Sequence, residues 1–220
     1  MALSMQSRKL ELVRYTIFES AIRLFARQGF DETTIEEVAQ AAGLSRGSFF
    51  RYFATKDDLL AYSVVNSGDV LVKAAAACPV GLSALELVRE TALAGANFSM
   101  SQPLTRQIIE ITARNFSARR AHKSRLVESE SRLAEVFAAR IENATGDDLE
   151  PRMLAILTLM VVDLTLSSWF KSGFKDGATV SERVFAQLSR VFCEPSGPSE
   201  FKGGQRSERR SAVPAPRGNK

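Results

Sequence analysis

Residues 33–56 constrain this chain most, because their capping and turn residues fix two short helices and the angle between them. Thr34 followed three residues later by Glu37 is a capping box, in which each side chain bonds the other residue's backbone N–H at a helix start. Gly43 ends this helix, since glycine adopts the left-handed backbone of a sharp exit at little cost. Ser45 caps a second helix by accepting from its free N–H groups. The stretch therefore predicts two helices joined by a tight turn.

The apolar side chains of this stretch favour one packing of the two helices. Ala39 is small at the position where the helices must cross closely. Leu44, Phe49 and Phe53 are expected to fill the wedge between them, with the second helix running over residues 46–53. This is the helix-turn-helix pattern, whose second helix enters the major groove of DNA.

Two arginines, Arg46 and Arg51, lie five residues apart on the flank of the second helix, which also carries Ser48. Arginine is the commonest specific reader of guanine, because its fork matches the O6 and N7 acceptors. An open alternative is that Arg46 only neutralises phosphates. Tyr52 has two readings as well, either a DNA contact or a core aromatic with its hydroxyl at the edge.

The rest of the chain has the apolar spacing of helices. One helix is expected from about residue 10 to Gln28, where Gly29 stops it, and another from Asp57 to about residue 77. Further helices are expected over residues 82–100, 103–116, 121–143, 151–173 and 181–192, the last capped by Ser181. No segment of period two is long enough for a sheet, so the predicted fold class is all-α.

The apolar run over residues 153–170 is just long enough to span a membrane. Asp163 interrupts it and no basic cluster anchors it, so we expect a helix buried on most sides within a bundle, and no membrane partner. An ionised carboxylate in an apolar helix needs a partner. Asp163 is therefore expected to line a cavity, to pair across a subunit interface, or to reach solvent, and the sequence does not rank these.

The net charge of +4 does not by itself indicate nucleic-acid binding. Residues 195–220 hold six basic and two acidic residues, so the whole excess lies in this tail. Its Pro, Gly, Ser and Arg composition predicts disorder. One hypothesis is that the tail adds nonspecific DNA affinity, and the plainer one is a solvated end. A second basic run, residues 114–125, is expected to be a solvated face, with an anion-binding role as the alternative.

Several kinds of active site are excluded or disfavoured by residue counts. His122 is the chain's single histidine, which rules out a multi-histidine metal site and leaves one possible base for a catalytic triad. Cys78 and Cys193 have no metal-binding spacing and are expected to be buried thiols in a reducing cytoplasm. No glycine-rich phosphate-binding loop is present in the sequence. We therefore expect no enzyme, no metal and no cofactor.

With these residues in view, the chain resembles the TetR family of bacterial transcriptional regulators. The resemblance covers about a fifth of the chain, from Ile17 to Leu60. The matching residues are Ala21, Leu24, Phe25, Gly29, Phe30, Thr33, Thr34, Val38, Ala39, Ala42, Gly43, Leu44, Ser45, Gly47, Ser48, Tyr52, Phe53, Lys56 and Leu59. It implies a three-helix DNA-binding head, a linking fourth helix, and a C-terminal domain for ligand binding and homodimerisation. The expected domains are residues 10–56 and 57–193, with disordered ends at residues 1–9 and 194–220.

The resemblance also assigns DNA contacts, residue by residue. Hydroxyl and N–H groups at Thr33, Thr34 and Ser45 would lie at phosphates, and Tyr52 and Lys56 would contact the sugar-phosphate backbone. The groove would be faced by Arg46, Gly47, Ser48, Phe50 and Arg51. The family pattern usually has tyrosine where this chain has Phe50, so this ring lacks the phenolic donor and is expected to make an apolar contact, such as one to a thymine methyl.

For the C-terminal half, the resemblance implies an effector cavity among the helices between about residues 64 and 169. Its candidate lining is Phe98, Ile108, Ile111, Phe116, Phe137, Asp163, Leu166, Trp169 and Phe170, for which ordinary core is the other reading. The last two helices are expected to form a four-helix bundle between two subunits. This bundle would bury Leu157, Met160, Val161, Leu164 and Leu188.

The expected function is that of a cytoplasmic regulator, a repressor that binds a palindromic operator in double-stranded DNA as a homodimer and leaves it when a small-molecule effector binds. Two alternatives come from other classes. One is a constitutive DNA-binding protein without an effector, which a missing cavity would favour. The other is a helical-bundle enzyme, which would need paired Glu-x-x-His motifs that a single histidine cannot supply.

Overall fold

The structure is a computed structural model that describes residues 5–140 and 149–193. Those ranges contain ten α-helices and no strand, which confirms the all-α class. We call α1 (Met5–Gln28), α2 (Ile35–Ala41) and α3 (Arg46–Phe49) the head. We call the other helices the body: α4 (Asp57–Ala77), α5 (Ala84–Ser101), α6 (Thr105–Arg114), α7 (Phe116–Lys123), α8 (Leu126–Ala138), α9 (Leu149–Lys171) and α10 (Gly177–Cys193).

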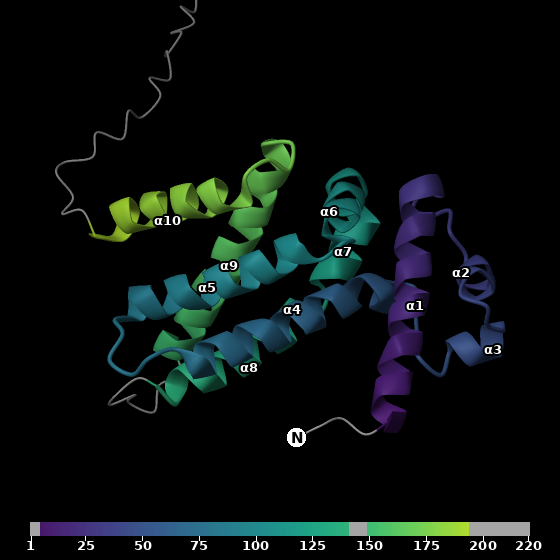
Figure 1. Cartoon of the computed structure of the whole chain (residues 1–220), viewed down its shortest axis with the longest axis horizontal. Helices are drawn as coiled ribbons and strands as arrows, with labels where there is room; N and C mark the ends of the chain where they lie inside the picture. The colour runs from purple at the N-terminus through teal and green to yellow at the C-terminus, as the bar shows by residue number, and fades with distance from the viewer. Residues whose placement is uncertain (1–4, 141–148, 194–220) are drawn as a thin grey trace, which may run out of the picture.

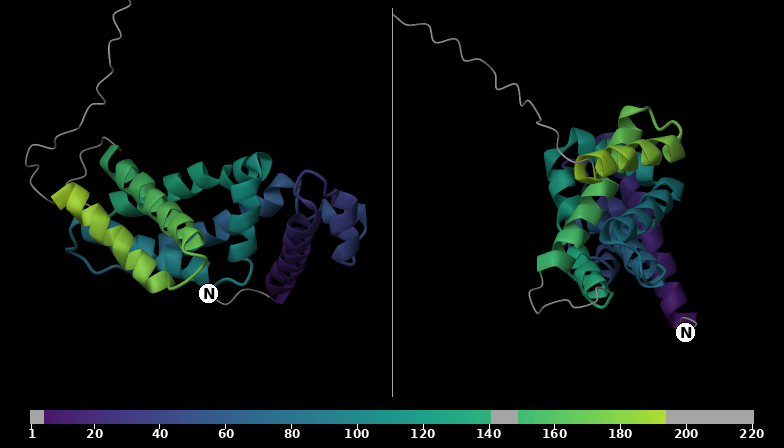
Figure 2. Two further views of the ribbon diagram at one scale, coloured as in Figure 1. Left: turned by 90° about the horizontal axis from the view of Figure 1, so that it is seen from above. Right: turned by 90° about the vertical axis from the view of Figure 1, so that its left-hand side faces the viewer.

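The molecule is elongated, with the head at one end and α10 towards the other (Figure 1). Helix α4 leaves the head and runs along the body, where it packs against α5, α7 and α8. Helices α6 and α7 lie between the head and α9 (Figure 2). Helices α9 and α10 pack together, and α9 also contacts α5 and α8. The body therefore places α6 and α7 between the head and the α9–α10 pair.

One hydrophobic cluster joins the head to the body. Phe25 and Phe49 of the head belong to the same buried cluster as Leu60 of α4, Ile108 of α6 and Ala118 of α7. Buried apolar surface contributes roughly 25 cal/mol per Å² to stability, so a tilt of the head that opened this cluster would be costly. Two smaller clusters fill the rest of the body, one around Leu133 and Phe137 and the other around Val161 and Phe185.

Two helix boundaries at the head end and middle of the chain differ from the expected ones. Helix α1 begins at Met5 rather than near residue 10. Residues 5–10 contain neither glycine nor proline, so nothing in the sequence stops the helix from extending. The helix expected over residues 121–143 is instead split into α7 and α8, and residues 141–148 lie outside the described part. Asn115 starts α7 as an N-cap, its side chain accepting from the N–H of Ala118 at 2.8 Å.

The expected cap of the last helix was also wrong. Helix α10 begins at Gly177, four residues before Ser181. Asp176 caps it by accepting from the N–H of Thr179 at 3.1 Å and from its hydroxyl at 2.6 Å. The Ser181 hydroxyl is buried and donates to the Gly177 carbonyl at 2.9 Å. Asp176 rather than Ser181 caps this helix because Asp176 reaches the first free N–H groups of the helix.

Helix α9 is not buried on most sides, contrary to the sequence expectation. Its length and apolar composition match those of a membrane-spanning helix, and 28% of its most apolar window is buried. Ala155, Thr158 and Trp169 lie on the face that packs against the body. On the opposite face Met160 and Leu164 are 62% and 55% exposed. The exposed Met160 and Leu164 are two of the residues that the sequence analysis expected at an interface between subunits.

Candidate nucleic-acid interface

Helix α2 is fixed at both ends by local hydrogen bonds. The Thr34 hydroxyl accepts from the N–H of Glu37 at 3.2 Å, and the Glu37 carboxylate accepts from the N–H of Thr34 at 2.8 Å. This backbone N–H is the main reason why the pKa of Glu37 lies below its ordinary value. At the other end Gly43 has φ +71° and the N–H of Leu44 donates to the Ala39 carbonyl at 2.8 Å. The predicted capping box and glycine exit are both present.

Helix α3 is shorter than expected. Ser45 caps it, accepting from the N–H of Ser48 at 3.2 Å, and regular α-helix covers Arg46–Phe49 rather than residues 46–53. The following residues form tighter turns, in which the N–H of Arg51 donates to Ser48 and that of Tyr52 to Phe49. The Phe53 N–H still donates to the Phe49 carbonyl four residues back at 3.2 Å, and both side chains enter the core, where they are 0% and 3% exposed.

The opposite side of α3 and its following turn faces solvent. Arg46, Gly47, Phe50 and Arg51 are exposed, with Phe50 at 44%. A Cβ added at Gly47 would have no atom within 4 Å in the described structure, so open space lies beside this backbone. The Arg46 guanidinium is 3.0 Å from the Glu36 carboxylate, and its carbon lies 5.8 Å from the centre of the Phe50 ring. Arg51 reaches the Ser48 hydroxyl at 3.5 Å.

Two residues expected to contact DNA have their side-chain polar groups bonded within the head. Thr33 is 2% exposed, and its hydroxyl donates to the Gly29 carbonyl at 2.6 Å. The Lys56 ammonium donates to the carbonyls of Phe30, Asp31 and Thr33 at 2.6, 3.2 and 3.1 Å, and it lies 4.5 Å from the centre of the Phe30 ring. A cation with three carbonyl acceptors has no free donor directed at a phosphate. Both side chains therefore hold the loop between α1 and α2.

Tyr52 has a mixed environment. The residue is half-buried and packs against the shared hydrophobic cluster. It also lines a groove of about 510 Å³ between head and body, together with Arg14, Tyr62 and Arg125. The guanidinium of Arg14 lies 5.2 Å from the Phe53 ring centre. Tyr52 thus packs against the core on one side and keeps an accessible edge on the other, so the two readings do not exclude each other.

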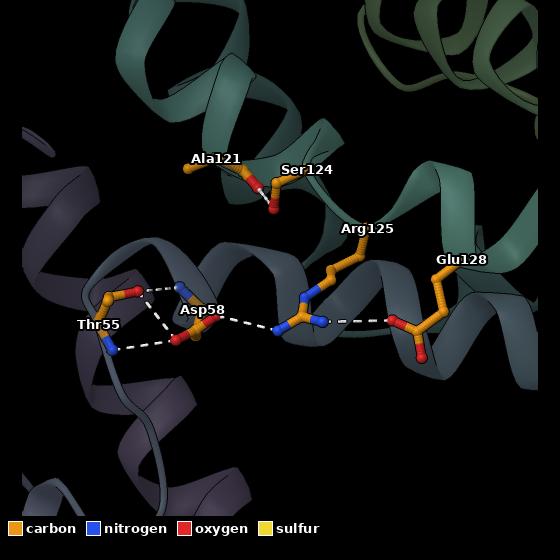
Figure 3. A network of polar contacts seen from close by, with 6 residues as sticks. All are labelled: Thr55, Asp58, Ala121, Ser124, Arg125 and Glu128. Atoms are coloured by element: carbon orange, nitrogen blue, oxygen red, sulfur yellow. Dashed lines mark hydrogen bonds and ion pairs between the residues drawn. The ribbon is translucent and has the colours of Figure 1, made fainter.

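Polar contacts also tie the head end of α4 to the body (Figure 3). Asp58, in the first turn of α4, accepts from the N–H and hydroxyl of Thr55 at 3.0 and 2.9 Å. Arg125, at the corner between α7 and α8, reaches Asp58 at 3.5 Å and Glu128 at 3.4 Å. The Asn115 side chain, between α6 and α7, donates to Asp31 of the head at 2.8 Å.

The basic run at residues 114–125 therefore does more than form a solvated face. Arg119 donates to the carbonyls of Thr112 and Ala113 at 3.0 and 2.9 Å, which satisfies the free C-terminal end of α6. Burial lowers the pKa of the half-buried His122 to about 4. The sequence missed these contacts because their partners lie in other elements or depend on where α6 ends.

The nine residues expected to line an effector cavity are not brought together. Phe98 and Ile108 line a small cavity of about 60 Å³ between α1, α4, α5 and α6. Ile111 belongs to the cluster shared with the head, and Phe137 is fully buried in a separate cluster. Phe116 is 79% exposed, contrary to expectation, because the Asn115 cap turns the chain outward there.

The remaining four candidates lie on α9, none of whose residues lines that small cavity. Asp163 is exposed and 3.4 Å from Lys123, so it reaches solvent beside a basic partner. Trp169 is buried against Phe174, with the Arg106 guanidinium 5.4 Å from its ring. Leu166 and Phe170 are half-buried. Within residues 5–140 and 149–193, no group of three or more His, Cys, Asp or Glu side chains is placed to hold a metal.

The residues expected at a subunit interface fall into two groups. Met160 and Leu164 are exposed on the outer face of α9. Val161 is 3% exposed in the cluster with Phe185, so it offers no surface to a partner. Leu157 and Leu188 are partly buried against that cluster. Val161 is one position from Met160, and a helix turns about 100° per residue, so the two side chains point in different directions.

Known proteins similar to this chain include several regulators. A family model described as bacterial regulatory proteins, tetR family, matches residues 17–62. TcmR, an HTH-type transcriptional regulator of Streptomyces glaucescens, is 26% identical over 177 residues, which cover 76% of this chain and 76% of TcmR. NalD, the secondary repressor of the MexAB-OprM multidrug efflux pump in Pseudomonas aeruginosa, is 19% identical with a TM-score of 0.56, over 82% of this chain and 96% of NalD.

A further solved structure is that of the transcriptional regulator FadR from Bacillus subtilis in complex with stearoyl-CoA. It is 16% identical, with a TM-score of 0.54, over 79% of this chain and 96% of that one. The two solved structures share the fold with this chain. These relatives regulate transcription and are not enzymes. The matched family model at residues 17–62, the similarity to TcmR and the shared fold together support the TetR family of bacterial transcriptional regulators for this chain.

Proposed function

We propose that this chain is a cytoplasmic repressor that binds a palindromic operator as a homodimer and leaves it when a small molecule binds. The observation that carries the proposal is the outer surface of α3 and its following turn. Arg46, Gly47, Phe50 and Arg51 are exposed there, while Phe49 anchors the same turn in the core. A short helix that is anchored on one side and exposed on the other can enter the major groove of DNA.

The proposed DNA contacts separate by type. Base edges are faced by Arg46, Gly47, Ser48, Phe50 and Arg51. The sugar-phosphate backbone is contacted by Thr34, Ser45 and Tyr52. The Thr33 hydroxyl and the Lys56 ammonium are removed from direct contact, since both are bonded inside the head. Both still matter for binding, because they hold the loop on which α2 begins.

The proposed dimer forms through α9 and α10. Met153, Met160 and Leu164 are more than half exposed on α9, as is Val191 on α10. Exposed apolar side chains gathered on one face mark an interaction surface, and a second copy of the same face completes a four-helix bundle. The exposed face of α9 would then be covered by protein rather than by lipid.

The proposed effector acts through the helices that touch the head. A molecule that enlarged the small cavity at Phe98 and Ile108 would displace α6 relative to α1. Ile111 and Asn115 of the same region contact the head directly. Effector binding would thus favour a conformer whose two α3 helices no longer match the operator. The complex of the similar FadR with stearoyl-CoA supports a role for small-molecule binding in this fold.

A second candidate function, a constitutive regulator without an effector, is favoured by the close packing of the body. A Cβ at Gly68 would meet the Ser129 hydroxyl, and one at Gly95 would meet Leu71. The cavity at Phe98 and Ile108 holds about 60 Å³, whereas ligand pockets commonly hold 300 Å³ or more. An effector that bound at this cavity would therefore have to enlarge it.

Selection of duplex DNA from a random pool, with the whole chain at fixed salt, tests the proposal. The expected product is an inverted repeat whose half-sites lie about one helical turn, or a multiple of it, apart. Light scattering of the complex should give an even number of chains per duplex. A pool without enrichment would contradict DNA recognition, and an asymmetric site bound by one chain would contradict the dimer.

The two candidate functions are separated by a thermal-shift screen of apolar small molecules, stearoyl-CoA included. A ligand that raises the melting temperature and weakens binding to the selected duplex supports an effector-released repressor. A ligand that stabilises the protein without changing its DNA affinity, or the absence of any stabilising ligand, supports the constitutive regulator.

A further inference from the structure

The Arg46 guanidinium has contacts to two side chains of the head. Its Nη1 atom lies 3.0 Å from the Glu36 carboxylate, which comes from the first turn of α2. Its guanidinium carbon lies 5.8 Å from the centre of the Phe50 ring, which comes from the end of α3. A carboxylate and an aromatic face are the two kinds of group that best orient a guanidinium.

Both supports are themselves fixed. The Phe50 ring packs edge-on against Phe49, with centres 5.5 Å apart and planes at 89°, and Phe49 is fully buried. Glu36 is the residue before Glu37 of the capping box, so the backbone that carries it is set by two hydrogen bonds to Thr34. Arg46 thus has contacts from two helices rather than from α3 alone.

We propose that Arg46 reads the edge of a guanine base, and that Glu36 is the positioning residue that aims it. The inference rests on the proposed contact of α3 with DNA. A phosphate bound by Arg46 would bring a second negative charge close to the Glu36 carboxylate, which is unfavourable. Guanine O6 and N7 are neutral acceptors, so a carboxylate behind the arginine is tolerated. Arginine has five N–H donors, and the contact to Glu36 leaves a pair free for these acceptors.

Arg51, the other exposed arginine of this surface, lacks such support. Its contact to the Ser48 hydroxyl is 3.5 Å long, and that hydroxyl also accepts from Ser45 at 3.0 Å. A loosely held arginine adapts to several acceptors, phosphates included. The sharper base preference is therefore expected from Arg46, not from Arg51.

The test uses the whole chain and the duplex selected by the wild-type protein. Competition binding on all single-base-pair variants of that duplex identifies the position at which Arg46→Ala loses discrimination. Glu36→Gln is then expected to lower discrimination at that base pair about two- to fivefold, the range for an exposed ion pair. In an Arg46→Ala background, Glu36→Gln should change no base preference.

The matched control is Glu32→Gln, which removes one exposed carboxylate of the head without touching Arg46. Both glutamine variants should bind random DNA more tightly, since each removes a negative charge. Only Glu36→Gln should alter base preference. A purely structural role of Glu36 at the start of α2 would lower the melting temperature and leave base preference unchanged.

The outcomes separate this inference from the proposed function. If the wild-type protein enriches no sequence, the proposed function and this inference both fail. If Arg46→Ala weakens binding equally on every duplex and reduces the salt slope by about one, Arg46 is a phosphate ligand and the inference alone is overturned. Unchanged discrimination in Glu36→Gln, or an equal change in the Arg46→Ala background, overturns the positioning role.

Discussion

Arg46 and Lys56 are both basic residues of the head, but their surroundings differ. Arg46 is exposed between a carboxylate and an aromatic ring. The Lys56 ammonium lies among three backbone carbonyls of the loop after α1. The sequence shows only that both are cations near a helix-turn-helix. Their roles depend on partners ten and more than twenty residues away, which no local pattern reveals.

Lys56→Met is predicted to destabilise the head by about 1–3 kcal/mol, because charge-assisted hydrogen bonds to three carbonyls are lost. Thermal unfolding of the whole chain measures the effect. The control is Lys73→Met, which removes an exposed lysine of α4 and should leave the melting temperature nearly unchanged. An unchanged melting temperature in Lys56→Met, with a DNA salt slope lower by one, would instead show a direct phosphate contact.

His122 predicts a pH dependence of stability. Its folded pKa of about 4 lies below the ordinary 6.5, mainly through burial, while Asp163 opposes and Lys123 adds to the shift. The unfolded chain therefore binds the proton more readily, and this contribution to stability is complete above pH 6.5 and lost as pH falls towards 4. The loss is about 3 kcal/mol.

Chemical denaturation of wild type and His122→Asn between pH 7 and pH 4 measures this contribution. The difference in free energy of unfolding between the two proteins should narrow or reverse as the pH falls, because the variant lacks this proton uptake. Parallel pH curves for the two proteins would mean that His122 does not titrate differently on folding.

At the scale of the helix, the sequence correctly predicted features that depend only on neighbouring residues. The capping box at Thr34 and the glycine exit at Gly43 both form as predicted, because each involves residues within a few positions. The end of α3 was not predictable, since residues 50–53 contain neither glycine nor proline to mark it. Similarly, Asp176 rather than Ser181 begins α10, although both are plausible caps in sequence.

The residues expected to line an effector cavity show a second limit of prediction from the sequence. Periodicity correctly marked Ile108, Ile111, Phe137 and Trp169 as inward-facing, and all four are buried. The periodicity does not indicate which of these four side chains line the same cavity, because that depends on how the helices cross. The apolar face of α9 is a related case. Hydrophobicity identified the helix but not which side the body covers, so Val161 was assigned to the wrong face.

The prediction at the scale of the helix concerns the exposed face of α9. Met160→Glu with Leu164→Glu should weaken the proposed dimer by on the order of 100-fold or more, since both subunits would then place charges in an apolar interface. Light scattering should shift towards the 24.1 kDa monomer with unchanged helical content. Val127→Glu on α8, also exposed and apolar, is the control. A dimer as stable as wild type would place the interface elsewhere.

For the whole molecule, the important feature is that head and body share one core. Ile111 lies on α6 of the body but packs in the cluster that contains Phe25 and Phe49 of the head. The Asn115 side chain donates to Asp31 across the same junction. Arg125 adds an ion pair to Asp58 at the head end of α4 (Figure 3). The domain boundary expected at residues 56 and 57 thus separates elements that we expect to unfold together.

Ile111→Ala is predicted to destabilise head and body together by about 2–5 kcal/mol, the usual cost of a buried isoleucine. Hydrogen exchange should show lower protection in α1 and in α6 to a similar degree. The control is Ile109→Ala, on the same helix but half-buried and outside the shared cluster. Lower protection confined to α6 would mean that the head is an independent unit.

The central claim is that the outer surface of α3 enters DNA, and Gly47→Leu tests it most directly. The added side chain points into open space in the free protein, so folding and assembly should be unchanged. Anisotropy titration of the selected duplex compares this variant with wild type and with Ser131→Leu, which adds a leucine at an exposed site of α8. We predict at least a 100-fold loss of affinity for Gly47→Leu alone. Wild-type affinity in a correctly folded Gly47→Leu protein would contradict the claim.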